Sequence, residues 1–116
     1  MPTQKDQLIQ AFQQFKRLPF PSSASNDELN LIHAELAEYD GFIAGTISSL
    51  LSGSKFSRGN LKFEQSLADR LENILSTSKD TKVLEQARKY LSYLEAIKNI
   101  LEEAWRLISN QELNPG

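Results

Sequence analysis

The stretch that decides the fold is Val83–Ile108, with the sequence VLEQARKYLSYLEAIKNILEEAWRLI. Apolar residues recur through it at alternating four- and three-residue steps, and this spacing places them on one face of an α-helix. The positions are Val83, Ala87, Tyr90, Leu94, Ile97, Leu101, Ala104 and Ile108. The pattern predicts one long packed helix over about residues 81–109, some 40 Å in length at about 1.5 Å per residue.

A further apolar stripe runs beside this one. Tyr93, Ile100 and Leu107 recur at seven-residue spacing, so the apolar face of the helix is wide. A face this wide requires several neighbouring helices or a partner chain. We therefore expect Tyr93, Ile100 and Leu107 to form a candidate interface of a homodimer, since apolar patches on a protein surface mark association. The alternative is that another helix of the same chain covers them.

Three more amphipathic segments precede this helix, over about residues 4–18, 26–52 and 61–76. Pro19 and Pro21 end the first one, because proline cannot continue a helix. Ser25 with Glu28 resembles a capping box at the start of the second segment, and Asn60 is a candidate cap for the third. Gly53 lies where a glycine commonly ends a helix.

Short connections between successive helices favour antiparallel neighbours. The fold class that we expect is therefore all-α, an up-down-up-down four-helix bundle with two long helices, about 26–52 and 81–109, and two shorter ones, about 4–18 and 61–76. Residues 1–116 form one domain, and we expect 110–116 to be a flexible tail.

Composition limits the function classes. The 116 residues hold 13 Lys and Arg against 15 Asp and Glu, which provides no overall attraction to nucleic acid or to an anionic membrane. The uncharged run 41–54 is shorter than the ~20 residues that span a bilayer. Cysteine is absent, which excludes disulfides, thiolate nucleophiles and cysteine-bound zinc. The N-terminus does not read as a secretory signal, so we expect a cytoplasmic protein that binds no nucleic acid and no membrane.

The segment 26–52 also carries small residues on a side distinct from its large aliphatic face, Gly41 and Gly45 among them. Glycine inside a helix costs roughly 1 kcal/mol relative to alanine, so these two glycines need an explanation. Close approach of another helix is one, and a cleft or a kink is the other. His33 and Asp40 lie at the border of this ridge, and with Gly41 and Gly45 they form a candidate ligand pocket.

Three cations cluster after that segment. Lys55, Arg58 and Lys62 surround a glycine just before the expected start of the next helix, where backbone amides and the helix dipole favour anions. They form a candidate anion site. The spacing of a nucleotide-binding P-loop is missing, so an ordinary surface loop is the competing interpretation.

The sequence carries no catalytic, metal-binding or cofactor motif. We therefore expect a small non-enzymatic interaction or regulatory protein that self-associates or binds a protein through its helix surfaces. One alternative is a ligand-binding or nucleotide-hydrolysing bundle with an acidic site on 26–52. Another is an immunity or antitoxin-type inhibitor of a basic partner, because residues 18–54 contain five acidic residues and no lysine or arginine.

Overall fold

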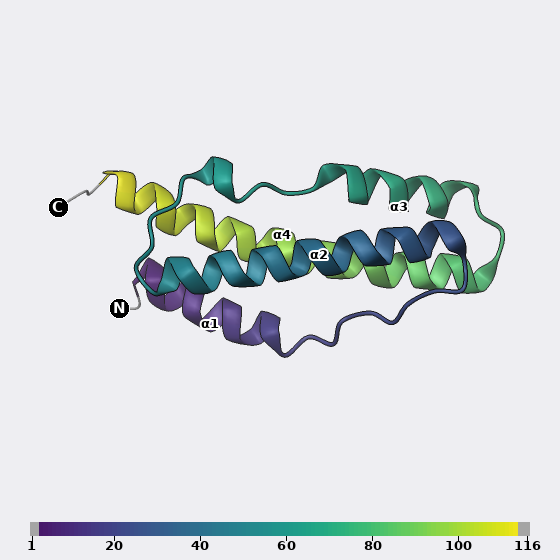
Figure 1. Ribbon diagram of the computed structural model, residues 1–116, viewed down its shortest axis with the longest axis horizontal. Coiled ribbons are helices and arrows are strands. Elements are labelled where there is room, and N and C mark those ends of the chain that lie inside the picture. Colours follow the sequence, from purple (N-terminus) through teal and green to yellow (C-terminus); the bar gives the residue numbers. More distant parts are fainter. Residues whose placement is uncertain (1–2, 114–116) are drawn as a thin grey trace.

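The computed structural model describes residues 3–113, with side chains as far as residue 111. The described chain is all-helical, and its elements alternate in direction along one long axis (Figure 1). They are α1 (Gln4–Lys16), α2 (Asp27–Leu51), the 3-10 helix η1 (Arg58–Asn60), α3 (Gln65–Thr77) and α4 (Thr81–Leu113). The prediction of an up-down-up-down four-helix bundle is confirmed. None of the described helices is both long and apolar enough to cross a membrane.

Local chemistry sets several helix ends. Thr3 and Asp6 form a reciprocal capping box at the start of α1. Asn26, rather than the expected Ser25, caps α2, because its side-chain oxygen accepts from the amide of Leu29 at 3.0 Å. Gly53 follows α2 with φ at 107°, a backbone conformation that side chains disfavour, so its predicted role as the terminating glycine is confirmed.

Two predicted boundaries are wrong. Helix α3 begins at Gln65 instead of residue 61, and Asn60 caps no α-helix because its side chain accepts from the backbone of Ser57 within the η1 turn. Helix α4 continues through Leu113, so residues 110–113 are helical and not part of a tail. Residues 114–116 of the predicted tail lie outside the described residues.

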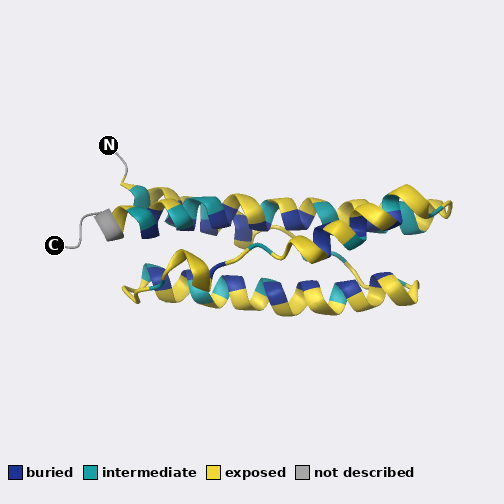
Figure 2. Ribbon diagram, turned by 90° about the horizontal axis from the view of Figure 1, so that it is seen from above, coloured by how far each residue is buried: buried dark blue, intermediate teal, exposed yellow. Residues whose placement is uncertain are grey.

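The core lies around α4. Helix α1 packs on the C-terminal half of α4, α3 lies along its N-terminal half, and the long helix α2 runs parallel to it (Figure 1). Buried residues of α2 form one stripe, whereas the opposite side of this helix is exposed along its length (Figure 2). The short helices therefore each cover only part of α4, and the rest must be covered by chain that is not helical.

Two extended segments provide that cover. The chain after α1 continues along the bundle through Pro19 and Pro21, and the chain before α3 runs through residues 61–64 (Figure 1). Phe20 packs edge-on to Tyr93, with ring centroids 5.1 Å apart, and Leu61 is fully buried. Each segment thus extends the apolar layer of the short helix beside it.

Extended backbone in this position needs hydrogen-bond partners that a helix would find within itself. Aromatic side chains of the two long helices supply them. Around the first segment, Nε2 of His33 donates to the carbonyl of Pro21 at 2.9 Å and the hydroxyl of Tyr90 donates to the carbonyl of Ser22 at 2.8 Å.

The second segment is held in the same way. Nε1 of Trp105 donates to the carbonyl of Leu61 at 2.7 Å. The hydroxyl of Tyr39 donates to the carbonyl of Lys62 at 2.6 Å and accepts from the amide of Glu64 at 3.2 Å. These aromatic residues therefore position the extended chain as well as filling the core.

Candidate functional site

The stripe expected to form a homodimer interface lies inside the single chain. Tyr93, Ile100 and Leu107 keep only 8, 2 and 6 % of their surface exposed. Helix α1 and the segment after it cover the stripe, and the ring of Phe15 lies 5.7 Å from that of Tyr93. The prediction that these residues are exposed is wrong. These residues are apolar because they belong to the core, as in the alternative that another helix of the same chain covers them.

His33 and Asp40 both make structural hydrogen bonds. His33 holds the Pro21 carbonyl as described, and its ring lies 5.2 Å from that of Phe20. Asp40 accepts from the hydroxyl of Tyr93 at 2.7 Å. Burial raises the pKa of the Tyr93 hydroxyl, and the hydrogen bond and charge of Asp40 raise it further. These contacts connect α2 to the opposite side of the bundle and account for both residues without a ligand.

Gly41 and Gly45 face open space. A Cβ atom built on either glycine would meet no atom within 4 Å, apart from its own helix and chain neighbours. Neither has a backbone conformation that requires glycine, since Gly53 has the positive φ among the described glycines. The expectation that another helix of the chain packs closely over this ridge is therefore wrong. The four candidate pocket residues do not converge either, because His33 and Asp40 point to interactions that the two glycines do not share.

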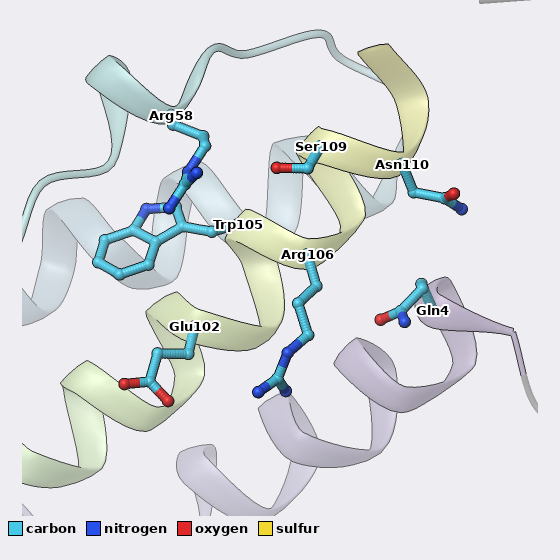
Figure 3. Close-up of a pocket in the computed structure, with 7 residues that line it drawn as sticks. All are labelled: Gln4, Arg58, Glu102, Trp105, Arg106, Ser109 and Asn110. Atoms are coloured by element: carbon cyan, nitrogen blue, oxygen red, sulfur yellow. The ribbon is translucent and has the colours of Figure 1, made fainter. Parts of the chain in front are cut away.

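The cations expected to bind an anion are not brought to one cavity. The guanidinium of Arg58 lies over the indole ring of Trp105, 5.5 Å from its centroid (Figure 3). Both residues line a cavity of about 440 Å³ together with Arg106, whereas Lys55 and Lys62 do not line it. Arg106 pairs with Glu103, so one of the two guanidinium groups already has a carboxylate partner. The remaining lining residues are Gln4, Glu102, Ser109 and Asn110.

The acidic residues of α2 line a second cavity, of about 320 Å³, between α2 and α3. Glu35 and Glu38 reach it from α2, and Glu64 from the segment before α3. Arg70 bridges to Glu35 at 2.6 Å, so this wall is partly neutralised. Among the described residues, no group of three or more His, Asp or Glu side chains is arranged to hold a metal ion.

The side of α2 that faces away from the bundle is exposed (Figure 2). Leu31 is 68 % exposed and Phe42 53 % exposed there, the highest values for large apolar side chains in the described chain. Small residues lie between them. We call this surface the outer face of α2, and it consists of Leu31, Ala34, Ala37, Glu38, Gly41, Phe42, Gly45 and Ser48.

Leu31 and Phe42 escaped the reasoning from sequence, although a signal was present. The buried stripe of α2 includes Leu29, Ile32 and Ile43, and the helical period of 3.6 residues places Leu31 and Phe42 off that stripe. An apolar residue outside the main apolar stripe of its helix is the pattern to search for.

Comparison with protein-family models, with curated proteins and with solved structures finds no match to this chain. The function must therefore be inferred from its own surfaces.

Proposed function

We propose that this chain is a small non-enzymatic interaction protein that binds a protein partner through the outer face of α2. The observation that carries the proposal is that Leu31 and Phe42, both on the outer face of α2, stay more than half exposed. Large apolar groups gathered on one face mark an association surface more often than isolated ones do. The predicted cytoplasmic location stays a prediction.

The two helical glycines support the same proposal. Gly41 and Gly45 together cost the helix roughly 2 kcal/mol relative to alanine. No contact among the described residues offsets that cost, since the space above them is open. A partner that approaches the helix backbone closely would use this space, because small residues allow a shorter distance between two helix axes.

Charge supports a protein partner over a membrane or a nucleic acid. Helix α2 carries five acidic residues and no lysine or arginine. An acidic surface repels phosphates and anionic lipids, so those polyanions do not fit this face. An inhibitor that masks a basic partner is a narrower form of the same proposal.

A photo-crosslinking residue placed at Ser48, on the outer face, tests this function in the protein's native cells. We expect a discrete covalent adduct, which mass spectrometry identifies. The same probe at the exposed Asn73 of α3 is the matched control, and the adduct from Ser48 should disappear when Gly41→Glu is introduced in the same chain. An adduct from Ser48 no stronger than from Asn73, or one that survives Gly41→Glu, would overturn the proposal.

The cavity between α2 and α3 supports a second candidate function, a ligand-binding or nucleotide-hydrolysing site. Glu35, Glu38 and Glu64 line this cavity. The described residues hold no group of three metal ligands, but one or two carboxylates are enough to bind magnesium when substrate phosphates complete its coordination. A ligand that binds the native state raises its melting temperature. Thermal denaturation with magnesium and nucleoside triphosphates therefore tests this candidate, and an unchanged Tm at millimolar ligand would exclude it.

A further inference from the structure

We propose that the partner of the outer face of α2 is the same face of a second copy of this chain, packed antiparallel with the two-fold axis beside Gly41. This inference rests on the proposed function and specifies its partner. Three properties of the face support it: the spacing of its small residues, the distribution of its charges and the position of its exposed aromatic ring.

The small residues are spaced symmetrically about Gly41. Ala34, Ala37, Gly41, Gly45 and Ser48 follow one another at steps of three, four, four and three residues. In an antiparallel pair, a residue before the axis faces the residue equally far after it on the partner. Ala34 then faces Ser48, Ala37 faces Gly45, and Gly41 faces its own copy. Every central contact therefore joins two small residues, which lets the helices approach closely.

The charges of α2 are compatible with an antiparallel pair and oppose a parallel one. All five acidic residues lie between Asp27 and Asp40, and the chain from Gly41 to Ser54 is uncharged. Antiparallel packing places each acidic half against the uncharged half of the partner. A parallel pair would place the acidic halves together, and such like-charge contact across an interface costs several kcal/mol.

The first cation after α2 is also compatible with an antiparallel pair. Lys55 lies 14 residues after Gly41, and Asp27 lies 14 residues before it. Both side chains are exposed, and Lys55 follows the C-terminal end of α2. The two-fold axis brings the C-terminal end of one copy's α2, which Lys55 follows, to the acidic N-terminal end of the other copy's α2. The ends of the interface are thus complementary in charge, and Glu38, three residues before the axis, lies against the uncharged half of the partner's α2.

The exposed aromatic ring lies next to the proposed axis. Phe42 follows Gly41 directly, so the two copies of Phe42 come to the same side of the pair, close to the axis. Each ring, 53 % exposed in one chain, then covers the other, and offset aromatic pairs of this kind are favourable. Leu31 reaches the C-terminal part of the partner's α2, which is uncharged, so this apolar contact buries no charged group.

The size of the face sets the expected strength. A helix of 25 residues is about 37 Å long, and a contact strip about 10 Å wide provides about 370 Å² on each copy. Stable complexes bury about 800 Å² per partner. We therefore expect a weak dimer that forms at tens to hundreds of micromolar, and the measurement must extend to about 1 mM chain.

Sedimentation equilibrium over that range, with circular dichroism to verify folding, is the first test. We expect a concentration-dependent dimer that Gly41→Glu weakens at least tenfold, because two like charges then face each other at the axis. Asn73→Glu adds the same charge on an exposed part of α3 and should leave the dimer unchanged. A strict monomer at 1 mM would overturn the inference, as would a dimer that Gly41→Glu does not affect.

The absence of natural cysteines allows a sharper test of direction. A disulfide forms only when two Cα atoms lie within about 7 Å. Gly41→Cys should therefore crosslink to itself under mild oxidation. Ala34→Cys alone should not, because its two copies lie about 21 Å apart along an antiparallel pair. A mixture of Ala34→Cys and Ser48→Cys chains should form the mixed disulfide. Efficient self-crosslinking of Ala34→Cys would demonstrate parallel packing and overturn the inference.

These results are separable from the proposed function. Suppose that the chain is monomeric at 1 mM, but that the Ser48 probe captures another protein and Gly41→Glu abolishes this capture. The inference that the partner is a second copy is then wrong, whereas the proposal that the outer face of α2 is an interaction surface stands. If neither dimer nor adduct forms, both proposals are wrong.

Discussion

Tyr39→Phe removes one oxygen atom and tests how the extended segment before α3 is held. The ring of Tyr39 is 8 % exposed and stays in place in this variant. The lost hydroxyl donates to the carbonyl of Lys62 at 2.6 Å and accepts from the amide of Glu64 at 3.2 Å. The perturbation is therefore confined to the two hydrogen bonds that join α2 to Lys62 and Glu64.

Each such bond contributes about 1 kcal/mol to stability. Two bonds predict a loss of about 2 kcal/mol in the free energy of unfolding, a large part of the stability of a small domain. The loss should be concentrated at residues 61–64, where the freed carbonyl and amide then depend on water. Chemical denaturation measures the global effect, and hydrogen exchange at the Glu64 amide measures the local one.

Tyr90→Phe is the matched control, because it removes a buried hydroxyl that makes one bond, to the carbonyl of Ser22. We expect it to cost about 1 kcal/mol and to leave exchange at Glu64 unchanged. A Tyr39→Phe protein as stable as the parent, with the same exchange rate at Glu64, would refute the reasoning that this hydroxyl holds the segment.

Three further predictions concern pH, the core and the helical glycines. Burial, the largest cause, raises the pKa of Tyr39 to about 12 from an ordinary value of 10.0. Because the folded state retains this proton longer than the unfolded state, the corresponding stability, about 3 kcal/mol, is present below pH 10 and is lost as the pH rises to about 12. Tyr39→Phe should lose less stability than the parent between pH 10 and 12, and parallel denaturation curves for the two proteins would contradict this. Ile100→Ala should cost 2 to 5 kcal/mol in urea denaturation because Ile100 is 2 % exposed, and an effect below about 1 kcal/mol would show that the site is not core. Gly45→Ala should stabilise the chain by about 1 kcal/mol in thermal or urea denaturation, since the new Cβ meets open space, and a lowered Tm would show that the backbone there needs glycine.

The helices followed from local pattern. The alternating four- and three-residue steps of Val83–Ile108 depend only on neighbours within two turns, so they predict α4 without knowledge of the fold. The buried stripe of α2, which includes Leu36 and Ile47, follows for the same reason. Boundaries were less accurate, as at Asn60, because a cap residue forms a local turn as readily as it starts a helix.

The candidate site was harder to predict. His33, Asp40 and Gly41 were grouped by their positions on a helical wheel, and a wheel does not show what packs beside it. Each of the two polar residues bonds to chain from another element, whereas the glycine faces open space. The exposure of Phe42 followed from its angle on the helix, but its significance depends on the absence of a covering element.

The sequence by itself determined four helices, their order and their alternating direction, because periodicity, capping residues and short connections act between near neighbours in the chain. Only the tertiary structure decided which apolar surface is buried and which is free. Tyr93, Ile100 and Leu107 are covered by α1, whereas Leu31 and Phe42 stay more than half exposed. Burial depends on which distant segment of the chain packs against a helix. The apolar residues of one helix have the same sequence pattern whether or not another segment covers them.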